Sequence, residues 1–232
     1  RRLCLYQAMN KKLSAKELAA RAQKILAERY PDAPAALLYK NPWELLVAVV
    51  LSAQCTDARV NMVTPDLFAR WPGPGELAQT SQEELEGVIR SIGFFRQKAK
   101  NLRAAAKLVA ENFAGQVPRS MEELVSLPGV ARKTANVVLF GAFGINDGIA
   151  VDTHVKRLSY RLGLTEQTEP EAVEKDLTGL FPREEWGNVN RRMVLFGREV
   201  CMARKPDCGS CGMREFCMRL EPPRKKAARG RP

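Results

Sequence analysis

LPGVARKTANVV, residues 127–138, joins a Pro–Gly turn to the beginning of a helical pattern. Pro128 restricts φ and Gly129 permits conformations that other residues resist, so the stretch predicts a tight turn between two helices. The second helix is expected to begin near Ala131, and the free main-chain N–H groups of such a terminus attract phosphate. The stretch therefore predicts a helical hairpin that holds a phosphate without reading bases, although an ordinary corner between helices has the same pattern.

Two charged residues follow this turn. Lys133 lies in the first turn of the second helix, where a partly desolvated ammonium close to other cations would lose its proton and become a nucleophile. The alternative is an ordinary surface lysine. Asp152 opens the helical pattern of residues 150–163 and is expected to be its N-cap, where a carboxylate could also steady a developing cation. His154 is the only histidine, and we expect it to be a hydrogen-bonded packing residue.

The rest of the chain also has helical patterns. Capping boxes are predicted at four places: Ser14–Glu17, Ser81–Glu84, Ser120–Glu123 and Thr168–Glu171. Asn41 and Pro42 predict a further helix start. The segment after them, ELLVAVVLSAQ (44–54), is apolar on all sides, which is typical of a central buried helix. No alternating strand pattern is evident, so we predict an all-α fold of about eight to eleven helices.

Charge and hydropathy narrow the class of protein. The 232 residues carry a net charge of +11, of which five charges lie in the C-terminal stretch 224–232. Because the remaining excess is spread over the rest of the chain, a polyanionic partner is favoured over a merely solvated basic surface. No apolar run approaches the roughly 18 residues of a membrane span, and no secretory signal is evident. We expect a soluble, cytoplasmic protein with no membrane partner.

A cluster of cysteines near the C-terminus predicts a metal site. Its spacing is C-x6-C-x2-C-x5-C, formed by Cys201, Cys208, Cys211 and Cys217. Four thiolates so close in sequence can surround one metal ion or one iron–sulfur cubane, and the spacing leaves zinc and iron–sulfur open. The loop between the first two cysteines contains Arg204 and Lys205, two cations that invite contact with phosphate.

Together, the hairpin stretch, VDTH (151–154) and the cysteine spacing resemble the endonuclease III family of helix–hairpin–helix DNA glycosylases, which carry a 4Fe–4S cluster. The resemblance runs from about Ser14 to Cys217 and includes the stretches 45–61 and 92–102. No single motif carries it, but the order and spacing of the motifs are specific.

The resemblance also implies a division into domains. A six-helix barrel containing the hairpin would span residues 35–147. Residues 1–34 and 148–232 would form a discontinuous iron–sulfur cluster domain with a basic C-terminal tail. The active site would lie in the cleft between the two domains and contain Lys133 and Asp152.

The reaction implied by the resemblance is base excision followed by strand cleavage. Lys133 would attack C1′ of a damaged nucleotide that is flipped out of the duplex, while Asp152 activates the attack and stabilises positive charge on the sugar. A Schiff base would form, the base would leave and β-elimination would nick the strand. The expected substrate is double-stranded DNA that contains oxidised pyrimidines, such as thymine glycol, or abasic sites. The enzyme would be a monomeric DNA glycosylase and AP lyase, associated with the nucleoid if it is bacterial.

Further residues match the family's DNA-contacting positions. Gln54 falls where a glutamine fills the gap left by the flipped base, and Phe94 falls where a leucine wedge is usual. The other expected DNA contacts are Leu127, Gly129, Val130, Ala131, Arg132, Arg204 and Lys205. The four clustered cysteines would ligate the 4Fe–4S cluster.

The chain departs from the family pattern at three places. Ala131 replaces the second glycine of the hairpin, Phe94 replaces the leucine wedge, and the loop containing residues 146–148 is about one residue longer. None of these changes removes a chemical group that the reaction needs.

Three other functions fit parts of the sequence. An adenine glycosylase of the same superfamily would lack Lys133 and would need a carboxylate before Gln54, where residues 45–53 contain none. A non-catalytic iron–sulfur protein that binds DNA has less need to retain both Lys133 and Asp152. A zinc-binding structural module would give a colourless preparation, whereas an iron–sulfur protein would be brown.

Overall fold

The computed structural model of the protein describes residues 13–219, which contain eleven α-helices, one short 3-10 helix and no strand. The predicted all-α fold class is therefore confirmed. The chain divides into two compact units. We call residues 34–150 the central unit, and residues 1–33 with 151–232 the terminal unit. The basic stretch 224–232 and Cys4 lie outside the described residues.

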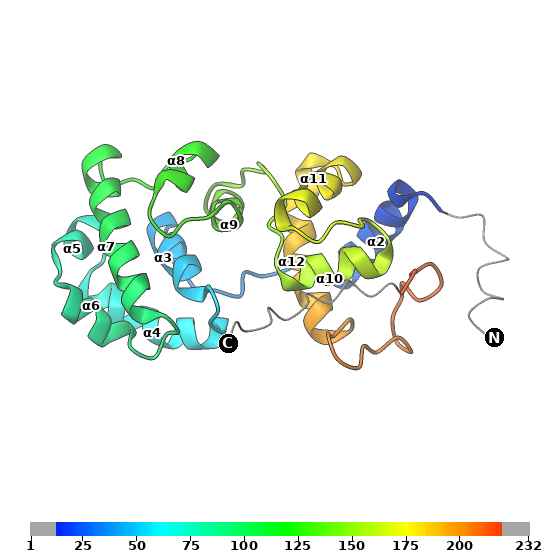
Figure 1. Ribbon diagram of the computed structural model, residues 1–232, viewed down its shortest axis with the longest axis horizontal. Coiled ribbons are helices and arrows are strands. Elements are labelled where there is room, and N and C mark those ends of the chain that lie inside the picture. Colours follow the sequence, from blue (N-terminus) through cyan, green and yellow to red (C-terminus); the bar gives the residue numbers. More distant parts are fainter. Residues whose placement is uncertain (1–12, 220–232) are drawn as a thin grey trace, which may run out of the picture. The chain divides into compact units, whose positions relative to one another are not determined.

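The central unit contains seven helices, which Figure 1 labels α3 to α9. They are α3 (Pro42–Ser52), α4 (Asp57–Arg70), α5 (Pro74–Gln79), α6 (Gln82–Ile89), α7 (Phe95–Asn112), α8 (Met121–Ser126) and α9 (Arg132–Phe143). Helix α3 contacts α4, α7 and α9. The other helices of the unit pack on this group, since α5 and α6 contact α7 and α8 contacts α9.

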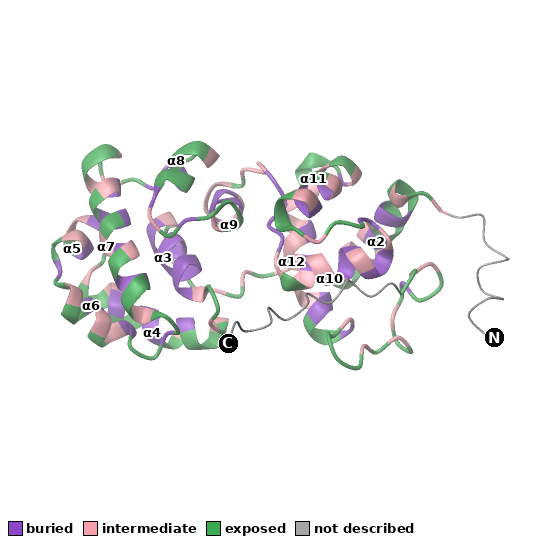
Figure 2. Ribbon diagram, in the orientation of Figure 1, coloured by how far each residue is buried: buried purple, intermediate pink, exposed green. Residues whose placement is uncertain are grey.

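Helix α3 is buried along its length, as its apolar sequence predicted. Every residue from Trp43 to Leu51 is buried, and Figure 2 shows the helix as an almost continuous purple ribbon. Its first turn is set by Asn41, whose Oδ1 accepts a hydrogen bond from the N–H of Glu44 at 2.9 Å, and by Pro42 at the first helical position. The helix is therefore fixed at its start by local chemistry and along its length by burial.

The described part of the terminal unit contains four α-helices and the 3-10 helix. They are α2 (Ala15–Arg29), α10 (Thr153–Leu162), α11 (Pro170–Leu180), η1 (Arg183–Glu185) and α12 (Trp186–Glu199). Helix α12 contacts both α2 and α10, and α2 also contacts α11. The segment that carries the four clustered cysteines follows α12. None of the helices within residues 13–219 combines the length and the hydrophobicity that crossing a lipid bilayer requires.

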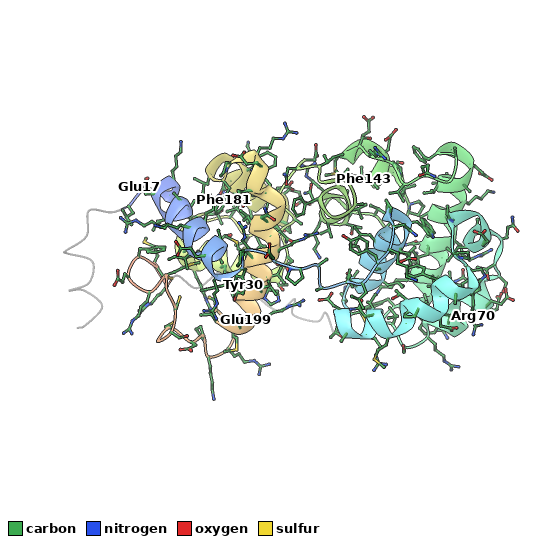
Figure 3. All side chains as sticks on the ribbon, turned by 180° about the vertical axis from the view of Figure 1, so that it is seen from behind. Glu17, Tyr30, Arg70, Phe143, Phe181 and Glu199 are labelled. Atoms are coloured by element: carbon green, nitrogen blue, oxygen red, sulfur yellow. The ribbon has the colours of Figure 1, made fainter. Side chains whose placement is uncertain are left out.

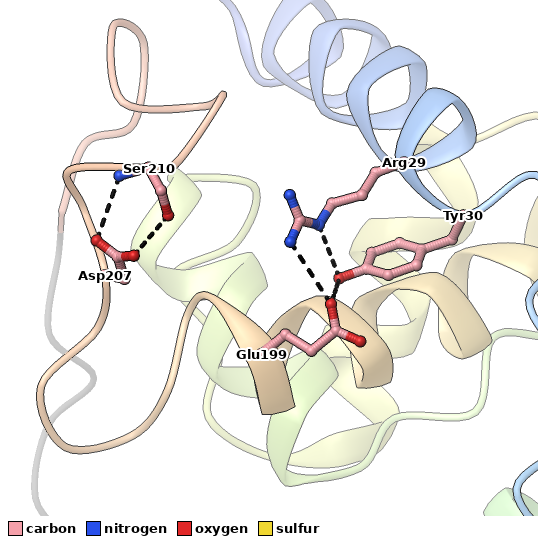
Figure 4. Close-up of polar contacts among 5 residues, drawn as sticks. All are labelled: Arg29, Tyr30, Glu199, Asp207 and Ser210. Carbon is pink, nitrogen blue, oxygen red and sulfur yellow. Dashed lines mark hydrogen bonds and ion pairs between the residues drawn. The ribbon is translucent and has the colours of Figure 1, made fainter.

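A polar cluster joins the ends of α2 and α12. The hydroxyl of Tyr30 donates to Glu199 Oε2 at 2.7 Å, and Arg29 Nε donates to the same hydroxyl at 3.1 Å (Figures 3 and 4). Burial raises the pKa of Tyr30, and the hydrogen bond to the Glu199 carboxylate adds to this effect. The cluster connects α2, the first helix of the described residues, to an element about 170 residues later in the chain.

Three of the four predicted capping boxes mark real helix starts. Ser14 and Ser81 form complete capping boxes with Glu17 and Glu84. Ser120 accepts a hydrogen bond from the main-chain N–H of Glu123, so it caps α8.

The fourth capping box, Thr168–Glu171, is wrong. Helix α11 begins one residue later than predicted, at Pro170, and its N-cap is Glu169, whose side chain makes no capping bond. Proline lacks an N–H and has a helical φ, so it suits the first helical position and moves the start of the helix past Thr168.

This difference predicts unequal effects of two similar substitutions. Ser14→Ala should lower the free energy of unfolding by about 1 kcal/mol because it removes a cap. Thr168→Ala should change it by less than about 0.5 kcal/mol because Thr168 caps no helix. Urea denaturation followed by far-ultraviolet circular dichroism measures both. Equal losses would contradict the structural assignment of the start of α11.

Candidate functional site

The predicted hairpin turn is present between α8 and α9. The N–H of Val130 donates to the carbonyl of Leu127 at 3.1 Å, and Gly129 has a φ of +83°. A proline at the second position and a left-handed glycine at the third define a type II turn. The side chains of Leu127 and Val130 are buried in the core. These two residues therefore present only their main-chain groups to a partner.

The two small residues of the turn have different requirements. A Cβ added to Gly129 would lie 2.9 Å from Nδ2 of Asn101, in addition to the positive φ, so a side chain is excluded there. Ala131 has a φ of −88° and a ψ of 165°, which any residue adopts. The alanine that replaces the family's second glycine thus imposes no backbone strain.

The N-terminus of α9 lacks a side-chain cap. Ala131 is the N-cap, and because alanine has no side-chain acceptor it makes no capping hydrogen bond. Arg132 and Lys133 are both exposed. The prediction that Lys133 is partly desolvated is therefore wrong for the protein alone, without DNA. The buried face of α9 is formed instead by residues such as Ala135 and Val138, on another side of the helix.

Asp152 is the N-cap of α10, as predicted. Its Oδ1 accepts hydrogen bonds from the main-chain N–H groups of His154 and Val155, both at 2.8 Å. Because both bonds use Oδ1, the cap does not require the second carboxylate oxygen. The carboxylate is half-buried and held in one orientation by the helix that it begins.

His154 is half-buried and packs against α12. Its Nδ1 lies 3.2 Å from Nη2 of Arg157, and a Cβ added to Gly197 would come within 2.7 Å of the same atom. Burial lowers the pKa of His154, although Asp152 opposes the change. The ring is consequently uncharged at neutral pH, which suits the predicted packing role.

Gln54 and Phe94 are two exposed residues in left-handed turns. Their φ angles are 54° and 57°, which non-glycine residues rarely adopt. Phe94 is 67% exposed, unusually open for a large apolar side chain. A Cβ added to Gly93 would lie 3.4 Å from the carbonyl oxygen of Gln54. The structure thus brings the two predicted DNA-inserting residues onto adjacent turns of the central unit.

A buried lysine lies beneath these turns and was not singled out by the sequence analysis. Lys98, in α7, is 7% exposed, and its Nζ donates to the carbonyls of Leu51 at 2.8 Å and Ala53 at 2.6 Å. Burial lowers its pKa, and the nearby Cys55 thiol opposes the change. The sequence did contain a signal that Lys98 is buried, because it falls on the apolar stripe of α7 together with Ala99 and Leu102.

Two arginines of α10 hold the beginning of the cysteine segment. Arg157 donates through Nε and Nη2 to the carbonyl of Cys201, at 3.1 and 2.9 Å. Arg161 is buried, and its Nη1 donates to the carbonyl of Met202 at 2.8 Å and lies 3.5 Å from Cys201 Sγ. Further along, the carboxylate of Asp207 accepts from the N–H and the hydroxyl of Ser210 (Figure 4). The segment is thus anchored at its start by α10 and held around Cys208 by the contacts between Asp207 and Ser210.

The four clustered cysteines are half-buried, and none forms a disulfide. Burial raises the pKa of Cys211 and Cys217, and negative charge on the other thiols of the cluster contributes to the increase. Across residues 13–219, no three His, Cys, Asp or Glu side chains stand in a metal-binding arrangement. Arg204 and Lys205 are exposed in the loop between the first two cysteines, and Lys205 has a φ of 56°.

Comparison with known proteins defines the class. Residues 47–183 match the family described as HhH-GPD superfamily base excision DNA repair protein. A thermostable thymine-DNA glycosylase of solved structure is 26% identical, with a TM-score of 0.77, over 90% of this chain and 97% of that chain. The protein is therefore a helix–hairpin–helix DNA glycosylase of base excision repair, and the predicted fold is confirmed.

Closer relatives identify the family. Endonuclease III of Synechocystis sp. is 53% identical over 90% of this chain and 95% of its own length. Endonuclease III of Bacillus subtilis is 46% identical over 83% of this chain and 88% of its own. A solved complex described as a trapped endonuclease III–DNA covalent intermediate is 46% identical, with a TM-score of 0.83, over 88% of this chain and 96% of that chain. The chain belongs to the endonuclease III family, and it is a DNA glycosylase and AP lyase.

The family match includes the predicted cofactor. Residues 201–217 match the iron–sulfur binding domain of endonuclease III, and this range begins and ends at the first and last clustered cysteines. The protein is thus a 4Fe–4S protein. The donor set fits such a group because soft thiolates are the usual ligands of iron–sulfur clusters. Bound iron would also offset the mutual repulsion of the thiolates.

Alanine should have graded effects at two glycines with positive φ: Gly115, which follows α7, and Gly129, in the hairpin turn. Gly115→Ala should cost about 1–2 kcal/mol of unfolding free energy, because φ is +76° but nothing lies within 4 Å of the added Cβ. Gly129→Ala should cost more and should also weaken binding to duplex DNA, because the new Cβ meets Asn101. Urea denaturation and fluorescence anisotropy with labelled duplex DNA measure the two effects. Equal effects of the two variants would exclude a role for the Asn101 contact.

Proposed function

We propose that the protein removes oxidised pyrimidines, such as thymine glycol, from duplex DNA and then nicks the strand by β-elimination. The observation that carries this proposal is the position of Lys133, an exposed amine in the first turn of a helix whose N-terminus has no side-chain cap. The uncapped N–H groups can bind a backbone phosphate. A phosphate held there would bring the adjacent sugar within reach of the amine.

Lys133 is proposed as the nucleophile. Its neutral amine would attack C1′, the bond from C1′ to the damaged base would break, and the open sugar would form an imine with Nζ. Loss of a proton from C2′ would then expel the 3′ phosphate. Because Lys133 is exposed in the free protein, we propose that bound DNA supplies the desolvation that favours its neutral form. The covalent intermediate named for the solved endonuclease III complex supports such a step.

Asp152 is proposed to stabilise positive charge on the same sugar. Its orientation is already fixed by the two main-chain hydrogen bonds to Oδ1. The second carboxylate oxygen is not needed for the cap, so it could face the reacting nucleotide. A preoriented carboxylate stabilises developing positive charge without reorganising during the reaction.

The remaining DNA contacts are proposed around these two residues. Gln54 would fill the gap left by the flipped nucleotide, and Phe94 would wedge the opposite strand. The hairpin would contribute the main chain of residues 127–131 and the side chain of Arg132. Arg204 and Lys205 would contact phosphates at a further point.

We propose Cys201, Cys208, Cys211 and Cys217 as the ligands of the 4Fe–4S cluster. The cluster would hold residues 201–217 in one conformation and so fix the loop that carries Arg204 and Lys205. This role is structural and positions DNA, and no step of the reaction passes through the cluster.

Every proposed functional group comes from one chain, so we propose a monomer. Its DNA substrate would place it in the cytoplasm, with the nucleoid, in a bacterial cell.

Borohydride trapping tests the nucleophile. Duplexes with one thymine glycol or one abasic site should both give a covalent adduct with the wild-type protein. Lys133→Gln should lower the yield by at least about a thousandfold, because the amine that forms the imine is absent. Lys107→Gln, at an exposed lysine of α7, is the matched control and should leave the yield unchanged.

The outcomes separate the alternatives. An adduct at the abasic site alone would indicate a lyase without this base specificity. Tight binding with no adduct at either site would indicate a non-catalytic protein. Asp152→Asn extends the test, because it keeps the capping acceptor and removes the charge. It should slow base release on the order of a hundredfold while the unfolding free energy changes little.

The cysteine assignment has its own test. Cys217→Ser should lose iron and the visible absorbance of the cluster, because serine is a poor ligand for iron–sulfur clusters. Cys55→Ser is the matched control: this half-buried, unpaired cysteine lies outside residues 201–217, so both signals should persist. Iron per chain and the visible spectrum measure the effect. Retention of the cluster in Cys217→Ser would remove that residue from the ligand set.

A further inference from the structure

We infer that Lys98 is a positioning residue that holds Gln54 and Phe94 in register, so that the two side chains enter the DNA as a pair. The inference deepens the proposed function and rests on it. It is carried by one residue that hydrogen-bonds to both turns, through its side chain on one side and its main chain on the other.

The side chain of Lys98 closes the C-terminus of α3. The last carbonyls of a helix have no N–H partner within the helix, and a cation is favourable there. Lys98 Nζ donates to Leu51 and Ala53, at 2.8 and 2.6 Å, and Ala53 directly precedes Gln54. The ammonium therefore fixes the point from which the Gln54 turn leaves α3.

The main chain of Lys98 fixes the other turn. Its N–H donates to the carbonyl of Phe94 at 3.1 Å, in the first turn of α7. Ile92, two residues before Phe94, is fully buried and anchors the turn from below. The close approach of Gly93 to the Gln54 carbonyl brings the two turns together directly. Lys98 thus links both turns to one point of α7.

Packing alone does not account for a lysine at this position. The neighbouring buried positions of α7 are apolar, and an unbranched apolar side chain would fill the same stripe without desolvating a charge. Gln54 and Phe94 also adopt left-handed conformations, which are strained for residues other than glycine. Such strain persists where the surroundings enforce it, and it concentrates at functional sites. The two hydrogen bonds from Lys98 Nζ are part of the surroundings that hold the strained turn at Gln54.

The test compares Lys98→Met with a matched control on the same helix. Methionine keeps the length of the side chain and removes both hydrogen bonds, while Lys100→Met removes an exposed charge of α7. On a thymine glycol duplex, Lys98→Met should lower kcat by about tenfold or more, and Lys100→Met should change mainly KM. Borohydride trapping on a single-stranded abasic oligonucleotide, which needs no wedge, should be the same for both variants within about twofold.

A double-mutant cycle separates positioning from a general structural role. In a Gln54→Ala/Phe94→Ala background the side chains that Lys98 positions are gone, so Lys98→Met should have almost no further effect on kcat. The same loss in both backgrounds would overturn the inference. If Lys98→Met does not fold, Lys98→Leu, which also removes both side-chain hydrogen bonds, takes its place in the cycle.

A binding readout keeps the inference separate from the proposed reaction. A 2-aminopurine placed beside a tetrahydrofuran abasic analogue in a duplex reports extrusion of bases without any chemistry. Wild-type protein and Lys100→Met should increase its fluorescence, and Lys98→Met should do so less. Absence of activity in the wild type would refute the proposed function alone. Full extrusion by Lys98→Met would refute the inference alone.

Discussion

The central unit depends on the burial of one helix that is apolar on every face. Helix α3 has no side that favours water, so it is stable only where other helices cover it on all sides. The side chains of α3 are buried in the core. The proposed functional residues therefore lie beyond its ends and on the helices that pack against it. At its C-terminus the chain turns outward at Gln54, and Lys98 of the covering helix α7 holds that turn. Helix α9, which also covers α3, carries Lys133 on a side away from the core.

The starts of α9 and α10 differ in whether a side chain caps them. Helix α10 begins with a complete cap, because Asp152 accepts from two main-chain N–H groups. Helix α9 begins without one, because Ala131 has no acceptor to offer. The capped start orients a carboxylate, whereas the lack of a side-chain cap at the other start is the feature on which its proposed binding of a phosphate rests.

The local features could be predicted because they depend on neighbouring residues. The Pro–Gly turn, the cap at Asp152 and the start of α3 each involve partners within about four positions. Thr168 shows the limit of such patterns, since the nearby Pro170 moved the helix start. The desolvation expected at Lys133 was wrong because exposure depends on which face of α9 meets the core. Lys98 was missed because its partners, Leu51 and Ala53, lie more than forty residues earlier in the chain.

The all-α class, the hairpin, the cysteine spacing and the family could all be predicted, since they depend on residue type and on separation along the chain. Which of these residues lie close together depends on the tertiary structure. It brought Gln54 and Phe94 onto adjacent turns, and it buried the side chains of Leu127 and Val130. It also placed Lys98 where it hydrogen-bonds to the turn before Gln54 and to the turn at Phe94. The physical reason is that burial and hydrogen bonding between distant segments depend on how the helices pack, which no local pattern encodes.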